Sequence, residues 1–424
     1  MASNKLINVR LYGSEIGRIG LEIDGNRSSF QFNPDYLQSN RFINIFPNTG
    51  IIRRVEHIQM FGQYNNTTFK GLPPQIADSL PDMFGSIIFK AWLEGTDRTD
   101  ISILEQLAYV GRRGMGAVEY SPIANLPDHG SIDISQIIEV LKDVLDMKKS
   151  SSQSHLNSQG LINIFRLGTS AGGVRPKILI SEHKETGEII PGDIEYSDQY
   201  HHYLVKLAIE EDFSYPREII EYCYYQIARS LGIAMMDSKL IDRRHFATLR
   251  YDRIGGEKKH VLTATGITGW DYTNPLHSSY ENLFKLCSFL RVSHAQIEEL
   301  FKRMVFNVVY GNVDDHLKNH SFIHDPVSDR WTLSPAYDIT FPLNPMLNFK
   351  RANRAMSING KRSQIGVEDI LAIADAFTIK NPRGVIKRVV AQQPILLQLL
   401  RDYDVSPRVI DKMVDQYNLL STYV

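Results

Sequence analysis

The stretch Gly311–Asp338, "GNVDDHLKNHSFIHDPVSDRWTLSPAYD", places five aspartates, three histidines and two asparagines within 28 residues. Two runs of alternating apolar and polar residues, "HSFIHD" and "RWTLS", flank turn residues at Asp325-Pro326. This pattern predicts a β-hairpin. The hairpin separates a polar loop around Asp314 from a carboxylate at Asp338.

The polar loop has a spacing that carries chemistry. Asp314 is followed five positions later by Asn319, and this D-x-x-x-x-N spacing is typical of a kinase catalytic loop. In such a loop the aspartate accepts the proton of the attacking hydroxyl, and the asparagine binds a metal ion. Asp338 follows the hairpin, where kinases place a second metal-binding aspartate, and oxygen ligands suit Mg²⁺. The alternative is a polar loop whose Asp and Asn side chains make turns and helix caps.

A phosphate-binding loop and a buried cation would complete such a site. The segment Gly168–Lys177, "GTSAGGVRPK", is rich in small residues that let backbone N–H groups approach phosphates, although it matches neither common glycine motif. Lys206 lies in the apolar strand "YLVKLAI", and Glu221 lies on the next predicted helix. Kinases pair such a lysine and glutamate. Taken singly, these features also fit a glycine turn, a snorkelling lysine and a solvated glutamate. Their order along the chain favours phosphoryl transfer.

The 424-residue chain has a globular composition, with 43% hydrophobic and 22% charged residues. Residues 5–35 alternate as in a small antiparallel meander, and the apolar residues from Met83 to Leu93 suit a helix. The segment "LEQLAYVGRRGMGAVEYSP" predicts a helix, a glycine turn and a strand. Residues 147–160 are Ser-rich and predict a linker.

The later chain predicts strands around one long helix that begins at Pro216 and ends at Gly232, then helices from about Asn282 almost to the end. We therefore predict an α+β chain with an N-terminal module at 1–125, a mostly β lobe carrying the Gly-rich loop at 126–275, and a C-terminal lobe at 276–424. The last two form a bilobal kinase-like fold in this prediction, with an all-helical C-terminal lobe apart from the hairpin.

Charge and composition narrow the possible settings. The formal net charge is −1, so strong DNA binding by this chain alone is not expected. The two cysteines, Cys223 and Cys287, have neither metal-ligand nor disulfide-framework spacing. The first residues lack a secretory pattern, and no apolar run reaches the ~18 residues of a membrane span. A reducing, cytoplasmic setting without a membrane partner is favoured.

The segments "GTSAGGVRPK", "LRYDR", "GNVDDHLKN" and "LSPAYD" resemble signature segments of the HipA family, the serine/threonine kinases of bacterial toxin–antitoxin pairs. "LPDMFG" and "AYVGRRGMGAVEY" resemble the N-terminal subdomain of that family. The resemblance implies an ATP- and Mg²⁺-dependent protein kinase that pairs with a small DNA-binding antitoxin of the HipB type. It also implies a cytoplasmic protein substrate involved in translation, a class that includes the aminoacyl-tRNA synthetases phosphorylated in the family.

The resemblance assigns a role to each matching residue. Asp314 matches the catalytic base, Asn319 and Asp338 match the Mg²⁺ ligands, and Lys206 matches the lysine that contacts ATP phosphates. Ser170 matches a serine that the family autophosphorylates, with Thr169 as a possible second acceptor. The implied nucleotide-binding residues are Ser170, Ala171, Gly172, Gly173, Val174, Arg175, Lys177, Lys206, Leu249, Arg250, Tyr251, His316, Lys318, Asn319, Tyr337 and Asp338.

Two other functions remain open from sequence. One is a small-molecule kinase of related fold, such as an aminoglycoside phosphotransferase-like enzyme, which shares the D-x-x-x-x-N spacing but not "GGVRPK" or "RRGMGA". The other is a non-catalytic corepressor bound to a DNA-binding antitoxin. The intact set of Asp314, Asn319 and Asp338 argues against a non-catalytic role.

Overall fold

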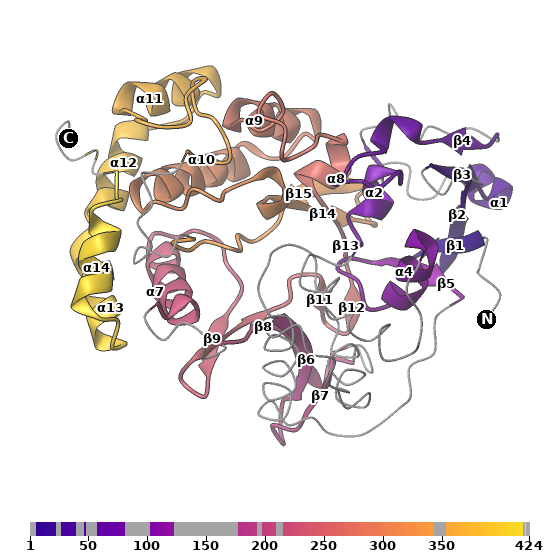
Figure 1. Ribbon diagram of the computed structural model, residues 1–424, viewed down its shortest axis with the longest axis horizontal. Helices are drawn as coiled ribbons and strands as arrows, with labels where there is room; N and C mark the ends of the chain where they lie inside the picture. Colours follow the sequence, from indigo (N-terminus) through magenta and orange to yellow (C-terminus); the bar gives the residue numbers. More distant parts are fainter. Residues whose placement is uncertain are drawn as a thin grey trace, which may run out of the picture.

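The computed structural model describes residues 6–22, 27–39, 46–47, 57–80, 102–122, 177–192, 197–208, 215–342, 353–418 and 420. Over these residues the chain is a mixed α+β protein with several antiparallel sheets and a helix-rich C-terminal region (Figure 1). The predicted helix from Met83 to Leu93 and the linker at 147–160 lie outside the described residues, as do residues 168–176 of the Gly-rich loop.

The N-terminal module contains a five-stranded antiparallel sheet of order β4-β3-β2-β1-β5. The predicted meander is confirmed as β1 (Leu6–Leu11), β2 (Ser14–Leu21) and β3 (Ser28–Phe32), and β4 (Gln59–Met60) extends it. The predicted helix, turn and strand are α4 (Ile103–Val110) and β5 (Val118–Ser121). Alternate apolar residues of β1 are fully buried, so that one sheet face contributes to the core. The described residues of the module also include the short helices α1 (Pro34–Gln38) and α2 (Pro74–Ala77).

A second five-stranded antiparallel sheet has the order β7-β6-β8-β10-β9. It comprises β6 (Lys177–His183), β7 (Ile189–Pro191), β8 (Tyr200–Lys206), β9 (Ser238–Ile241) and β10 (His245–Leu249). The helix α7 (Arg217–Ser230) packs against β9 and β10. All but the short β7 follow the sequence prediction, and α7 carries Glu221.

Over its described residues the C-terminal region consists of helices and the predicted hairpin, which is confirmed. Its hairpin, β14 (Ser321–Asp325) and β15 (Arg330–Leu333), pairs with β13 (His260–Thr263) in a three-stranded sheet. β14 is the middle strand of this sheet, so both of its backbone edges are paired. The helices are α8 (Ala264–Thr268), α9 (Tyr280–Phe289), α10 (His294–Val309), α11 (Val367–Ala376), α12 (Pro382–Val390), α13 (Gln393–Asp402) and α14 (Pro407–Val414).

Figure 1 places the N-terminal module at one end of the molecule and α11–α14 at the other, with the β13–β15 sheet between them. The chain leaves β10 at Leu249, makes the small hairpin β11 (Arg253–Ile254) and β12 (Glu257–Lys258), and enters β13. The segment after β10 therefore joins the second sheet to the C-terminal region. Among the helices that the structure describes, none has the length and apolar character needed to cross a bilayer.

Candidate active site

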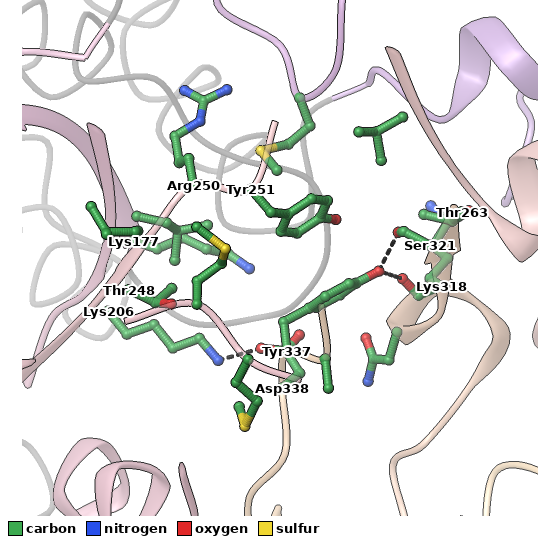
Figure 2. A pocket seen from close by; sticks show the side chains of 18 of the residues that line it. Lys177, Lys206, Thr248, Arg250, Tyr251, Thr263, Lys318, Ser321, Tyr337 and Asp338 are labelled. Carbon is green, nitrogen blue, oxygen red and sulfur yellow. Dashed lines mark hydrogen bonds and ion pairs between the residues drawn. The ribbon is translucent and has the colours of Figure 1, made fainter. Parts of the chain in front are cut away.

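A cleft of about 1150 Å³, which includes open solvent at its mouth, lies between the second sheet and the β13–β15 sheet (Figure 2). The structure brings together there most of the residues that the sequence singled out. These residues are Lys177, Lys206, Leu249, Arg250, Tyr251, Lys318, Asn319, Tyr337 and Asp338. Glu221, the proposed partner of the lysine, also lines the cleft.

One end of the cleft holds a buried cation between two carboxylates. Lys206, at the end of β8, donates from Nζ to both carboxylate oxygens of Glu221, at 2.7 and 2.9 Å. The same ammonium is paired with Asp338 (Figure 2). The side chains of Lys206 and Glu221 are 13% and 8% exposed. The pairing of strand lysine and helix glutamate that the sequence predicted is therefore present.

The electrostatics of this cluster follow from burial and charge together. Burial opposes the charge of Lys206, but the carboxylates of Asp338 and Glu221 raise its pKa above the usual value. Burial raises the pKa of Glu221 to about 7, with Lys206 opposing this shift. Burial would also raise the pKa of Asp338, but Lys206 and then Lys177 lower it below the usual value. Asp338 is thus the carboxylate that keeps its charge.

The backbone presents Asp338 in an unusual conformation. Its φ is +52°, in the left-handed region that non-glycine residues rarely adopt. The carbonyl of Asp338 accepts a hydrogen bond from Nδ2 of Asn312 at 3.2 Å, and this amide also donates to Asn307 at 3.0 Å. These bonds hold the conformation that turns the carboxylate toward Lys206.

The catalytic-loop candidate is held by a hydrogen bond between its two ends. Nδ2 of Asn319 donates to the backbone carbonyl of Asp314 at 2.8 Å, so that the amide oxygen is left as the acceptor end of Asn319. The Asp314 side chain is 64% exposed, and Nε2 of His316 lies 4.0 Å from its carboxylate. Desolvation within the loop, together with the charges of Asp338 and Asp315, raises the pKa of Asp314, while His316 opposes the shift. Asp314 and His316 are not among the residues that line the cleft.

A buried network that sequence reasoning missed fixes this loop. Arg354 forms an ion pair with Asp315, and it donates to the carbonyls of Asn307 at 3.2 Å and Asn312 at 3.0 Å. The Tyr280 hydroxyl donates to Asp315 at 2.6 Å. The side chains of Arg354 and Asp315 are 5% and 1% exposed. The carboxylate next to Asp314 is therefore structural, which leaves Asp314 as the exposed acid of the pair.

Two tyrosines form part of the cleft wall. The rings of Tyr251 and Tyr337 stack with centroids 5.7 Å apart. The hydroxyl of Tyr337 donates to the carbonyl of Lys318 at 2.7 Å and lies 2.5 Å from the hydroxyl of Ser321 (Figure 2). Arg250, a predicted nucleotide-binding residue, lines the cleft, and its guanidinium donates to Asp252 at 3.0 and 2.8 Å.

The predicted phosphate-loop residues Ser170, Ala171, Gly172, Gly173, Val174 and Arg175, with Thr169, lie outside the described residues. Lys177, the first residue of β6, is buried and lines the cleft. The contribution of the N-terminal module to the lining was not predicted from the sequence. The module contributes Asp78, Ser79, Met115 and Val118.

Comparison with known families identifies these segments. The model of the HipA-like C-terminal domain matches residues 169–395, and that of the HipA N-terminal domain matches residues 7–121. The chain belongs to the HipA family. The first match spans the second sheet, the catalytic-loop candidate and Asp338, and the second covers the N-terminal sheet. The family predicted from the sequence is therefore confirmed.

Relatives of this HipA-family chain include two with descriptive names. A Sinorhizobium fredii protein named "Putative kinase Y4dM" is 24% identical over 388 residues, covering 84% of this chain and 83% of the relative. A Haemophilus influenzae protein named "Putative kinase" is 27% identical over 190 residues, covering 40% of this chain and 52% of the relative. The solved HipA from Shewanella oneidensis, in complex with HipB and operator DNA, aligns over 97% of this chain and 96% of its own, with a TM-score of 0.65 and 15% identity. That similarity shows a shared fold.

Proposed function

We propose that this HipA-family chain is an ATP- and Mg²⁺-dependent protein serine/threonine kinase. The observation that carries the proposal is the Lys206 ammonium, held between Glu221 and Asp338 at the end of a cleft that also contains Asn319. Phosphoryl transfer requires mostly positioning and charge neutralisation, and this cluster supplies both. The names of the two relatives support the same activity.

In this proposal the fold is bilobal, with the second sheet and α7 as one lobe and the region from β13 to α14 as the other. The cleft between them is large enough for a nucleotide. Leu249 and Tyr251, on the segment that joins the lobes, would flank the base. Lys206 and Lys177, at the other end, would bind phosphate oxygens.

The residues present fit a magnesium ion that is bound mainly through phosphates. Asn319 and Asp338 each offer an oxygen, and the described residues contain no cluster of three or more His, Cys, Asp or Glu side chains able to hold a metal by themselves. Mg²⁺ in phosphotransferases is typically held by one or two protein oxygens plus substrate phosphates and water. When bound, it would neutralise charge on the transferred phosphate.

In this proposal Asp314 is the catalytic base. Its carboxylate is 64% exposed, so a serine or threonine hydroxyl of a protein substrate can reach it. It would accept the proton of that hydroxyl as the oxygen attacks the terminal phosphate of ATP. Lys206 would leave Asp338 to bind phosphate, while Glu221 keeps the ammonium oriented.

We further propose that the kinase is the toxin of a toxin–antitoxin pair and binds a small DNA-binding antitoxin of the HipB type. The Shewanella relative was solved with HipB and operator DNA, and the net charge of −1 is consistent with DNA binding through a partner. Its substrate in this proposal is a cytoplasmic protein involved in translation. Autophosphorylation at Ser170 would add about −1.5 to −2 charges where ATP phosphates bind, and thereby inactivate the kinase.

Calorimetric titration with ATP tests the site, with and without Mg²⁺. We expect binding that depends on Mg²⁺ and is weakened at least tenfold by Asp338→Asn. Asp198→Asn, at an exposed pair with Lys184, is the matched control and should bind as the wild type does. Mass spectrometry after incubation with Mg·ATP should find phosphate on Ser170 or Thr169. Magnesium-independent binding that Asp338→Asn leaves unchanged would contradict the proposal.

A further inference from the structure

The N-terminal module forms part of the wall of the candidate nucleotide cleft. Asp78, which follows α2, and Ser79 line the cleft together with Met115 and Val118, which lie at the end of the glycine turn and the start of β5. The rest of the lining comes from residues C-terminal to position 176. The cleft therefore has a wall that a two-lobed kinase-like core would not contain.

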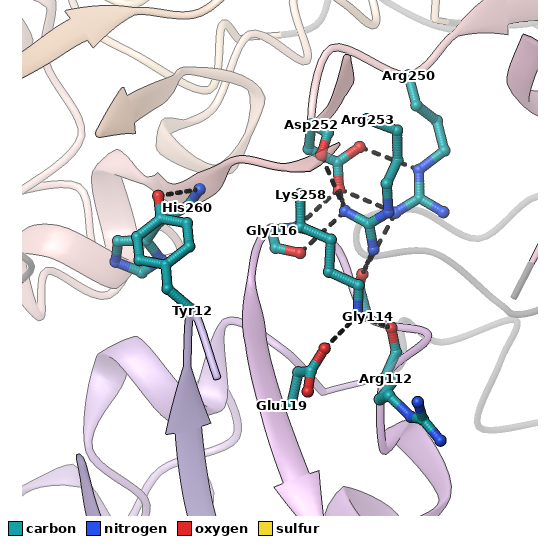
Figure 3. Close-up of polar contacts among 10 residues, drawn as sticks. All are labelled: Tyr12, Arg112, Gly114, Gly116, Glu119, Arg250, Asp252, Arg253, Lys258 and His260. Atoms are coloured by element: carbon teal, nitrogen blue, oxygen red, sulfur yellow. Dashed lines mark hydrogen bonds and ion pairs between the residues drawn. The ribbon is translucent and has the colours of Figure 1, made fainter. Parts of the chain in front are cut away.

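A buried ionic clasp holds this wall in place (Figure 3). The Asp252 carboxylate, on the segment that joins the lobes, accepts from the backbone N–H of Gly116 at 2.7 Å and is paired with Arg250 and Arg253. Arg253 in turn donates to the carbonyls of Gly114 and Gly116, at 3.0 and 2.9 Å. The turn that carries Met115 is thus fixed against the base-binding segment.

Two further interactions join the N-terminal module to β12 and β13. The N–H of His260, at the start of β13, donates to the Tyr12 hydroxyl at 3.0 Å, and Lys258 is paired with Glu119 (Figure 3). These contacts join the N-terminal module to β12 and β13, so the wall keeps a defined position relative to Thr263, the last residue of β13.

Asp78 has the most definite geometry of the four wall residues. Its Oδ2 accepts from the N–H of Thr263 and its Oδ1 from the Thr263 hydroxyl, both at 2.8 Å. A Cβ on Gly266 would lie 2.5 Å from Oδ2, so the carboxylate is closely packed against α8. Burial raises the pKa of Asp78, with the charge of Lys318 and the bonds from Thr263 opposing.

The two ends of the cleft carry different polar groups, which suit different parts of a nucleotide. The ammonium groups of Lys177 and Lys206 mark the phosphate end, and Figure 2 shows Thr263, Ser321 and Lys318 on the opposite side. A carboxylate repels phosphate but accepts hydrogen bonds from hydroxyls. A carboxylate offers about four lone-pair positions, and the two bonds from Thr263 use two of them. Asp78 can therefore accept from a ligand hydroxyl as well.

We propose that Asp78 is a specificity-determining residue that accepts a hydrogen bond from a ribose hydroxyl of the bound nucleotide. The N-terminal module then completes the nucleotide site and discriminates against a nucleotide that lacks this hydroxyl. This inference rests on the proposed function, because it assigns the sugar of the same ATP whose phosphates Lys206 binds.

The test is calorimetric binding of Mg²⁺ complexes of ATP, 2′-deoxy-ATP and 3′-deoxy-ATP. The wild type should bind at least one deoxy analogue about tenfold or more weakly than ATP, as expected for loss of a hydrogen bond to a charged group. In Asp78→Asn, this ratio should fall toward one. Thr263→Ala is the matched control, because it disturbs the same contact while keeping the carboxylate, and its ratio should remain that of the wild type.

A structural role for Asp78 alone would weaken ATP and both analogues equally, and an unchanged ratio in Asp78→Asn would overturn the inference. Equal binding of all three nucleotides by the wild type would also overturn it, without any variant. If the wild type binds no nucleotide, the proposed function fails together with the inference. Nucleotide binding that depends on Lys206 but shows no discrimination of the sugar overturns the inference alone.

Discussion

Asparagine in place of Asp252 removes the charge that joins the N-terminal module to the segment after β10. The wild-type carboxylate is fully buried between Arg250 and Arg253, whose side chains are each 1% exposed. It also accepts from the N–H of Gly116 at 2.7 Å (Figure 3). The amide of asparagine keeps one acceptor oxygen but leaves both guanidinium groups buried without their counter-charge.

Breaking a buried ion pair by removing one partner costs about 3–5 kcal/mol, because the remaining charge is uncompensated. Asp252→Asn should therefore lower the free energy of unfolding by about 3 kcal/mol or more. The matched control is Glu119→Gln, at the partly exposed pair with Lys258 in the same interface. Burial lowers the pKa of Lys258 to about 8, so the lysine can release its proton near neutral pH. Glu119→Gln should lower the free energy of unfolding by about 1 kcal/mol or less.

The assay is urea denaturation at pH 7, followed by circular dichroism and tryptophan fluorescence. The pH dependence gives a second check. Burial opposes the charge of Asp252, but Arg250 and Arg253 hold its pKa well below the usual value. The stabilisation is thus present above the unfolded-state pKa of about 3.9 and is lost as the pH falls through the lower folded-state pKa. The difference in free energy of unfolding between the wild type and Asp252→Asn should stay constant from about pH 5 to 8 and become smaller in stronger acid. If Asp252→Asn lowered the free energy of unfolding by no more than Glu119→Gln does, the stabilising role of the Asp252 cluster would be refuted.

Three other changes test the site. Lys206→Met should weaken ATP binding about tenfold or more and raise the pKa of Glu221 above its value of about 7, as calorimetry and carboxylate infrared titration would show. His316→Gln removes a charge that lowers the pKa of Asp314, so the acid limb of kcat/KM should move to higher pH; an unmoved limb would exclude Asp314 as the titrating base. Ser170→Asp should weaken ATP binding relative to Ser170→Ala in equilibrium dialysis, and equal affinities would contradict the switch.

Sequence alone predicted the features that depend on short-range patterns. The meander β1–β3 and the hairpin β14–β15 follow from alternating apolar residues and turn residues. The pairing of Lys206 with Glu221 followed from a strand that leads into a helix only 15 positions later. In each case the physical cause lies within a few neighbouring residues or one supersecondary unit.

Contacts between distant segments could not be predicted in this way. Arg354 lies 39 positions from Asp315, and Asp78 lies 185 positions from Thr263. Such pairs exist only after the modules have packed, and no local periodicity encodes them. The hairpin itself was predicted, but its pairing with β13 was not, because β13 lies about 60 positions earlier in the chain than β14. No local sequence pattern predicts that pairing.

In the proposed mechanism this chain transfers the terminal phosphate of ATP, with Asp314 as the base. The most direct measurement is the transfer of labelled phosphate from Mg·[γ-³²P]ATP to the protein itself, in the wild type and in Asp314→Asn. We expect Mg²⁺-dependent incorporation by the wild type and a rate at least about a hundredfold lower in the variant, with ATP affinity retained. Equal incorporation by the two proteins, or none by a wild type that binds Mg·ATP and is free of prior phosphorylation, would contradict the account.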